Sequence, residues 1–374
     1  MKIGIVCYPT FGGSGVVATE LGIALANKGH QVHFISYDQP VRLNGAQKNI
    51  FYHEVRVSDY PLFDYQPYEL VLTSKLVDVV KYEKLDLLHV HYAIPHASAA
   101  YMAKQILKKE GIDIPYITTL HGTDITLLGK DESFEPVITF AINESDAVTA
   151  VSESLKQDTV KFFHVKRDIK VIPNFICPDE YEVPRNEGLR KIYAPNGEFI
   201  LTHISNFRPV KRVGDVMKVF EQVRKEIPSK LLLVGDGPER HALEKMCRDS
   251  HLCGDVIFVG KVKQTIDLLR LSDLFLLTSE TESFGLAALE ALAAGVPVIS
   301  SNTGGIPEVN VQNYSGFLSD VGNVEEMAKN AISILKNPEK FEQFKSNALE
   351  VASRFNIEKV LPLYEDLYHS VIRK

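Results

Sequence analysis

The sequence predicts an α/β protein with two doubly wound domains, each built on a parallel sheet. Short β-branched runs alternate with amphipathic stretches, which is typical of βαβ units. A polar segment with three prolines, residues 177–197, interrupts this alternation once, and 374 residues are enough for two domains. Because ligands of such sheets bind at the carboxyl ends of the strands, we expect a cleft lined by strand-end loops from both domains.

The predicted strands occur in two series separated near residue 175. We expect a first domain at 1–175 and a second at 176–355. The first series consists of KIGIVCY, QVHFISY, NIFYHEV, LDLLHVHY, PYITTLHG and DAVTAVS. The second consists of EFILTHIS, KLLLVGDG, DVIFVG, DLFLLTS and VPVISS.

The composition excludes several classes of protein. The 41 basic and 48 acidic residues give a net charge of -7 without a basic stripe, which argues against a nucleic-acid partner. No apolar stretch approaches 18 residues and no signal peptide is evident, so we expect no membrane insertion and a cytoplasmic location. The four cysteines lack C-x-x-C spacing, which favours reduced thiols over a disulfide or zinc framework.

The first glycine loop has the letters of a dinucleotide fingerprint in residues 13–18, and Asp38 stands where a ribose-binding acid would be expected. However, five residues separate the preceding strand from Gly13, which makes the loop wider than such a fingerprint requires. A helix that begins near Ser14 presents unpaired amides to an anion. The loop therefore predicts contact with a phosphate or carboxylate, and not NAD in particular.

The second half contains a motif of several parts in residues 278–309. Glu282 lies in a strand-end loop, a helix opens at Phe284-Gly285, and Glu290 lies inside that helix. A carboxylate is a natural acceptor for ribose hydroxyls, and amides at a helix start can bind sugar hydroxyls or diphosphate oxygens. The predicted amide donors are those of Ser283, Phe284, Gly285 and Leu286.

The segment ISNFRPVKR, residues 204–212, supplies candidate cations in Arg208 and Lys211. Fixed cations in such a loop can bind an anionic ligand. The chain has no D-x-D sequence to hold a diphosphate-bound metal, and His89 and His91 lie on one face of a strand without forming a ligand triad. We therefore predict no metal requirement.

Together these motifs resemble the E-x7-E region of retaining family 4 glycosyltransferases with the GT-B fold, and the likeness covers nearly the whole chain. It implies that Glu282 lies near the donor sugar, that Glu290 binds the nucleotide ribose, and that Lys211 faces the leaving diphosphate. Asn206 occupies the position where the family commonly has arginine, so we assign the second cation to Arg208. The likeness also implies that the last helix, about 356–374, packs on the first domain.

Four further segments, PTFGGSGVVATELG, HFISYDQPVRLN, HYAIPHA and TLHGTDIT, resemble family members of bacillithiol biosynthesis. This resemblance implies transfer of N-acetylglucosamine from UDP-N-acetylglucosamine to L-malate, with retention and without a cofactor. Gly13 is assigned to the departing phosphate, and His121 holds the donor or orients the attacking hydroxyl. The expected acceptor-binding residues are Ser14, Arg42, Tyr92, Thr119 and His121.

Several alternatives stay open at this point. Arg42 can instead form a surface salt bridge. The chain can be a family 4 enzyme with another acceptor, a UDP-N-acetylglucosamine 2-epimerase, a nicotinamide-dependent oxidoreductase or a sugar-nucleotide sensor. A homodimer is compatible with the sequence. For the transferase we predict front-face attack, because no carboxylate is assigned to the position beneath the anomeric carbon.

Overall fold

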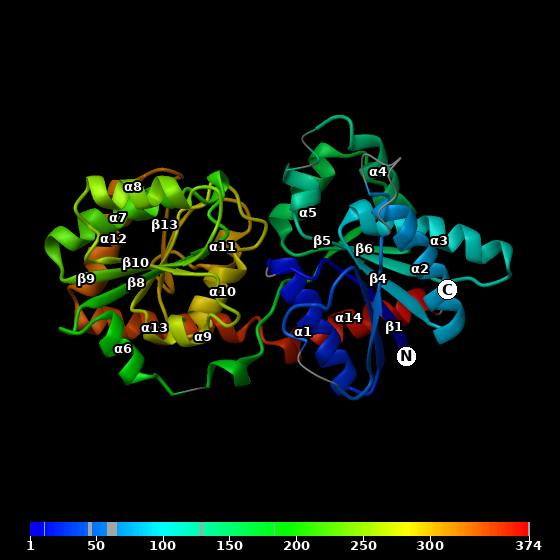
Figure 1. The fold of residues 1–374 in the computed structure, drawn as a ribbon, viewed down its shortest axis with the longest axis horizontal. Coiled ribbons are helices and arrows are strands. Elements are labelled where there is room, and N and C mark those ends of the chain that lie inside the picture. The colour runs from blue at the N-terminus through cyan, green and yellow to red at the C-terminus, as the bar shows by residue number, and fades with distance from the viewer. Residues whose placement is uncertain are drawn as a thin grey trace. The chain divides into compact units, whose positions relative to one another are not determined.

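The computed structural model describes residues 1–10, 12–43, 47–57, 66–127, 129, 131–182 and 184–372. The chain divides into two compact units. Unit 1 consists of Met1–Asn174 together with Ile357–Lys374, and unit 2 consists of Phe175–Asn356. Each unit has one parallel sheet with helices on both faces, so the predicted fold class is confirmed (Figure 1).

Unit 1 contains a seven-stranded sheet with the order β3-β2-β1-β4-β5-β6-β7. Every neighbouring pair of these strands is parallel. The strands are β1 (Lys2–Val6), β2 (Gln31–Ser36), β3 (Ile50–Glu54), β4 (Leu87–His91), β5 (Tyr116–Leu120), β6 (Ala147–Ala150) and β7 (Ile169–Val171).

Helices cover both faces of this sheet. On one face α1 packs with α14, and on the other α2 packs with α3 (Figure 1). Phe34 in β2 faces α1, because its ring contacts the position of Gly22. The helices are α1 (Gly13–Asn27), α2 (Tyr68–Glu83), α3 (Ser98–Lys109), α4 (Glu135–Glu144), α5 (Glu153–Phe162) and α14 (Ile357–Ile372), with single π-turns η1 (Ala93–Ala97) and η2 (Thr123–Leu127).

Unit 2 contains a six-stranded sheet with the order β10-β9-β8-β11-β12-β13, again with parallel neighbours. The last of its strands lies in a segment for which the sequence predicted none, residues 310–323. The strands are β8 (Phe199–Ser205), β9 (Ser229–Gly235), β10 (Val256–Gly260), β11 (Leu274–Leu277), β12 (Val298–Ser301) and β13 (Gly316–Ser319).

The core of unit 2 has two layers, because successive residues of its strands point to opposite faces. Leu201 and Leu231 face the larger cluster with α7 and α12, and Ile200 and Leu232 face the smaller one with α6 and α9. The helices are η4 (Pro178–Tyr181), α6 (Glu187–Tyr193), η5 (Pro209–Lys211), α7 (Val213–Glu226), α8 (Arg240–Asp249), α9 (Ile266–Leu271), α10 (Leu286–Ala293), α11 (Ile306–Val309), α12 (Val324–Leu335) and α13 (Pro338–Ser353).

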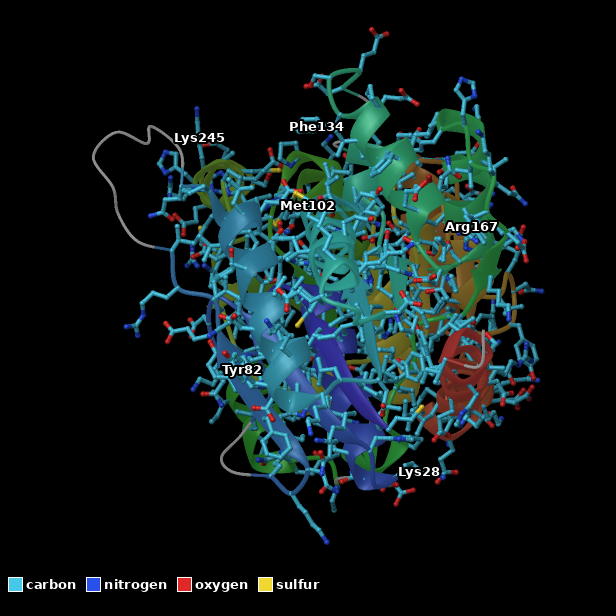
Figure 2. All side chains as sticks on the ribbon, turned by 90° about the vertical axis from the view of Figure 1, so that its right-hand side faces the viewer. Lys28, Tyr82, Met102, Phe134, Arg167 and Lys245 are labelled. Carbon is cyan, nitrogen blue, oxygen red and sulfur yellow. The ribbon has the colours of Figure 1, made fainter. Side chains whose placement is uncertain are left out.

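The surface is mixed in character. Aromatic side chains are exposed singly, for example Tyr82 in α2 and Phe134 before α4 (Figure 2). Scattered exposed apolar residues are normal for a globular protein. Within the described residues, none of the helices combines the length and apolarity needed to cross a membrane.

Each sheet has one topological switch point, where the strand order reverses direction. It lies between β1 and β4 in unit 1 and between β8 and β11 in unit 2. The loops that leave two such strands diverge at their carboxyl ends and open a crevice for a ligand. The predicted site residues should therefore be sought in the loops that follow these four strands.

Candidate functional site

The first switch-point loop of unit 1 connects β1 to α1. The helix begins at Gly13, and its first backbone hydrogen bond runs from the Gly15 N–H to the Gly12 carbonyl at 3.1 Å. The amides of Gly13 and Ser14 precede that bond and are available to an anion. A Cβ at Gly15 would lie 2.4 Å from the Thr10 carbonyl oxygen, so glycine is required there for the loop to fold back onto the helix.

Tyr92 and Ser14 meet across this crevice. Tyr92 directly follows β4 and adopts a left-handed backbone conformation with φ of 88°, which is rare for an aromatic residue. Its hydroxyl donates to the Ser14 Oγ at 2.6 Å. The structure thus brings together two of the predicted acceptor residues, and the strained backbone at Tyr92 is of the kind that concentrates at functional sites.

His121 follows β5 and is held by another histidine. Its Nε2 lies 2.7 Å from the Nδ1 of His91, the last residue of β4, and the two rings stack. Tyr92 also contacts the His121 ring, with 5.3 Å between the ring centroids. Burial lowers the pKa of His121 to about 3, so the ring is neutral at pH 7 and its Nδ1 is left to contact a ligand.

Asp124 is a feature of this region that the sequence prediction missed. Its buried carboxylate accepts from the Ala93 N–H at 2.8 Å and from the Gly122 N–H at 3.1 Å. It therefore joins the loop after β4 to the loop after β5. Burial raises the pKa of Asp124 to about 6 although these amides favour the ionised form. The sequence offered one indication of this role, because Asp124 ends the segment HGTD that begins with His121.

Thr119 and Arg42, which were also predicted to bind the acceptor, are engaged with residues other than Ser14, Tyr92 and His121. The Thr119 side chain is fully buried, and its hydroxyl is engaged with the His89 Nε2 and the Thr149 Oγ1, both at 2.7 Å. The other ring nitrogen of His89 bonds the Tyr368 hydroxyl of α14 at 2.8 Å. Arg42 pairs with Glu20 of α1 at 3.5 Å, which is the salt bridge that the sequence left as its alternative.

An ion pair lies at the switch point of unit 2. The Lys211 Nζ and the Glu282 Oε1 are 2.5 Å apart, and both side chains are largely buried. The Ser279 hydroxyl donates to the same carboxylate oxygen at 2.9 Å. Glu282 therefore has Oε2 left to accept hydrogen bonds from a ligand, and the cation of Lys211 is fixed where β8 and β11 diverge.

Three glycines hold the loops that carry these groups. A Cβ at Gly235 would lie 1.8 Å from the Ser205 carbonyl oxygen, and one at Gly237 would lie 1.9 Å from that of Asn206. Similarly, a Cβ at Gly304 would lie 2.0 Å from the Glu282 carbonyl oxygen. These close approaches fix the backbone on both sides of the ion pair. The G-D-G sequence after β9 was visible, but spacing alone did not connect it to the distant loop.

Arg208 and Asn206 differ from Lys211 in their environment. Both are exposed, whereas the intervening Phe207 is fully buried and has a left-handed backbone with φ of 40°. Phe207 anchors the loop so that its neighbours face solvent. Arg208 forms no ion pair with any residue that the structure describes, and its guanidinium is available to an anion.

The helix start predicted near Phe284 is present as the amino end of α10. Gly285 precedes the helix with φ of 92°, and the first backbone bond runs from the Leu289 N–H to the Gly285 carbonyl. The Leu286 amide is therefore presented at the helix start. Phe284 packs inward on Phe355, so its side chain anchors the turn. Glu290 lies buried within α10.

Comparison with known proteins agrees with this architecture. The family model Glycosyltransferase Family 4 matches residues 11–180, and the model Glycosyl transferases group 1 matches residues 185–351. The chain belongs to the family 4 glycosyltransferases of the GT-B fold. Within this class, N-acetyl-alpha-D-glucosaminyl L-malate synthase of Bacillus anthracis is 48% identical to the chain, and the alignment covers 100% of this chain and 98% of that protein.

Solved structures share the fold at low sequence identity. Sucrose-phosphate synthase from Thermosynechococcus elongatus has a TM-score of 0.81 at 19% identity, over 100% of this chain and 99% of its own. The Anabaena protein HepE in complex with UDP-glucose has a TM-score of 0.81 at 21% identity, over 99% of this chain and 100% of its own. The fold, the family and the glycosyltransferase activity predicted from the sequence are thereby confirmed.

Proposed function

We propose that this glycosyltransferase moves N-acetylglucosamine from UDP-N-acetylglucosamine to the hydroxyl of L-malate, with retention, in bacillithiol biosynthesis. The observation that carries the proposal is the 48% identity to the Bacillus anthracis synthase over both full lengths. The arrangement of polar groups at the two switch points supports it. The alternative activity, that of a UDP-N-acetylglucosamine 2-epimerase, would instead need a catalytic base at C2 of the sugar and would use no acceptor.

In this proposal unit 2 binds the donor. Lys211 and Arg208 are cations at the switch point that can neutralise the leaving diphosphate without a metal. Glu282, held by Ser279 and Lys211, accepts hydrogen bonds from sugar hydroxyls through Oε2. The amides of Ser283–Leu286 contact the sugar or diphosphate, and Glu290 binds the ribose. Asn206 borders the diphosphate in place of the usual arginine.

Unit 1 binds the acceptor and orients its hydroxyl. The Ser14 amide at the start of α1 binds a carboxylate of the acceptor, and the linked hydroxyls of Ser14 and Tyr92 provide a second polar contact. The Gly13 amide stays assigned to the departing phosphate of the donor. His121 is neutral, and His91 fixes its ring. We assign to its Nδ1 the task of orienting the attacking hydroxyl, and we retain Arg42 as a second contact for a carboxylate.

The transfer proceeds by front-face attack. The malate hydroxyl oxygen bonds to the anomeric carbon on the face from which UDP departs, while the bond from that carbon to the diphosphate breaks. The hydroxyl proton passes to the departing phosphate oxygen. Lys211 and Arg208 offset the negative charge on the diphosphate, and the α configuration is retained.

The proposal is tested by measuring UDP release from UDP-N-acetylglucosamine in the presence of EDTA. We expect release with L-malate, a product with the mass of N-acetylglucosaminyl-malate, and an α-anomeric proton in its NMR spectrum. Succinate is the matched control, because it has both carboxylates and lacks the hydroxyl, and it should support no release. Release that is indifferent to malate, or conversion to an epimeric UDP-sugar, would overturn the proposal.

A further inference from the structure

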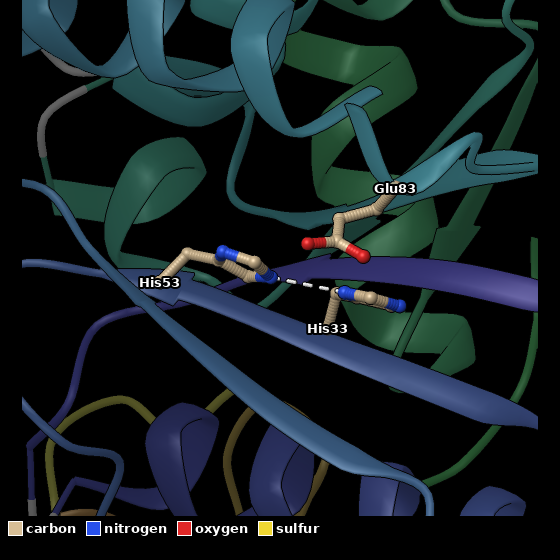
Figure 3. A group of neighbouring side chains, drawn as sticks. All are labelled: His33, His53 and Glu83. Carbon is tan, nitrogen blue, oxygen red and sulfur yellow. Dashed lines mark hydrogen bonds between the residues drawn. The ribbon is translucent and has the colours of Figure 1, made fainter. Parts of the chain in front are cut away.

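Two histidines and a glutamate converge in unit 1, away from the loops that we assign to the acceptor. They are His33 in β2, His53 in β3 and Glu83 at the end of α2 (Figure 3). One ligand atom from each lies within 4.8 Å of the others. Glu83 lies near the amino ends of β1 and β4, since its carbonyl accepts from the Lys2 Nζ at 2.8 Å. The acceptor loops follow the carboxyl ends of the strands.

The two rings are already arranged as a chelating pair. The His33 Nδ1 and the His53 Nε2 are 2.9 Å apart and are joined by a hydrogen bond (Figure 3). Stacking on Phe51, with 4.6 Å between ring centroids, fixes the orientation of the His33 ring. Tetrahedral zinc holds nitrogen ligands at about 2.0–2.1 Å, which separates two of them by about 3.3 Å. Only a small movement is needed to admit an ion.

A carboxylate completes the set of ligands. One oxygen of Glu83 lies within 4.8 Å of a nitrogen of each ring, and His33 is buried while His53 and Glu83 are half-buried. An ion at this place would therefore be held by two imidazoles and one carboxylate.

We propose that His33, His53 and Glu83 bind one divalent transition-metal ion, with zinc as the preferred ion. Two imidazoles and a carboxylate form a ligand set that zinc accepts, with a fourth position open to water. The ion would link β2, the edge strand β3 and α2, which are separate in the sequence. This site is structural, and it leaves the metal-independent transfer proposed above unchanged.

The test is zinc binding to the full chain after treatment with EDTA, measured by calorimetry and by competition with a chromophoric chelator. We expect one zinc ion per chain and a raised thermal midpoint, because the ion binds the folded state. His53→Gln should abolish binding. Glu83→Gln, at a partly exposed position that tolerates the change, should weaken it more than about tenfold.

The matched control is His241→Gln, which removes an exposed histidine of α8 and should leave zinc binding unchanged. Circular dichroism checks that each variant is folded. Absence of stoichiometric zinc binding in the wild-type chain would overturn the proposal, as would equal binding by His53→Gln and wild type. Because UDP release is measured with EDTA present, failure of the zinc site is distinguishable from failure of the proposed function.

Discussion

The loops at the switch point of unit 1 carry tyrosine, serine and histidine side chains, whereas the matching loops of unit 2 carry Lys211, Arg208 and Glu282. The contacts that join the predicted acceptor residues of unit 1 are between neutral groups, as in Tyr92 with Ser14 and His91 with His121, and the nearby Asp124 carboxylate binds backbone amides. The central contact in unit 2 is an ion pair of 2.5 Å. The two sheets have equivalent topology at these points.

This difference shows that the same sheet architecture can carry groups suited to two different tasks in one reaction. A departing diphosphate gains negative charge, and fixed cations stabilise it best in a largely desolvated position. An attacking hydroxyl is uncharged and needs orientation, which neutral hydrogen-bonding groups provide. In the reaction that we propose, unit 2 therefore supplies the cations for the leaving group, and unit 1 supplies the neutral groups that orient the nucleophile.

The largest effect should come from removing the fixed cation. We expect Lys211→Ala to lower kcat by about 100- to 1,000-fold, the usual result of losing one preorganised transition-state contact. UDP release with saturating malate measures it. Lys218→Ala is the control, because Lys218 lies on the following helix and pairs outward with Asp215. A loss of less than tenfold for Lys211→Ala would break the contrast between the units.

The sequence predicted this contrast in part. Alternation of apolar runs located eleven of the strands, because buried parallel strands are continuously apolar. It missed the last strand of each sheet: β7 has only three residues, and β13, GFLS, begins with glycine and ends with serine. The resemblance of two motifs to those of the family identified Lys211 and Glu282 as candidates. It did not reveal that His91 holds His121 or that Gly237 supports Asn206, because those contacts join residues brought together by the fold.

The second prediction concerns acid stability. Among the described residues, unit 1 has six histidines whose pKa values are lowered by burial, against one in unit 2. Those of unit 1 are His33, His53, His89, His91, His96 and His121, and that of unit 2 is His203. Below pH 6.5 the unfolded chain binds protons that these folded rings do not. Stability is thus lost as pH falls, by up to about 1.4 kcal/mol per pH unit for each ring.

Asp124 acts in the opposite direction, because its raised pKa of about 6 lets the folded state bind a proton first. One group does not offset six, so unit 1 should open before unit 2 between pH 6.5 and 5. Thiol labelling can follow the units separately, since Cys7 is buried in unit 1 and Cys247 in unit 2. Cys253 is exposed and serves as the control. Simultaneous labelling of Cys7 and Cys247 would contradict the prediction.

The smallest effects should come from substituting glycines. These substitutions test the role of glycine in closing a loop, which both units share, and the binding of different substrates, which distinguishes the units. An alanine Cβ at Gly304 would collide with the Glu282 carbonyl, and one at Gly15 with the Thr10 carbonyl. We expect each alanine variant to lower the free energy of unfolding by about 1–3 kcal/mol, as overpacking does. Gly214→Ala is the control, because nothing lies within 4 Å of its Cβ and alanine favours a helix interior.

The ligands should then respond differently to these two similar changes. Gly304→Ala displaces the loop that carries Glu282, so UDP binding should weaken while the KM for malate changes little. Gly15→Ala displaces the start of α1, so the KM for malate should rise while UDP binding is retained. Urea unfolding, calorimetry with UDP and steady-state kinetics measure the three quantities. If both variants lost UDP binding equally, the division of the two substrates between the units would be wrong, although the shared role of glycine in closing each loop would stand.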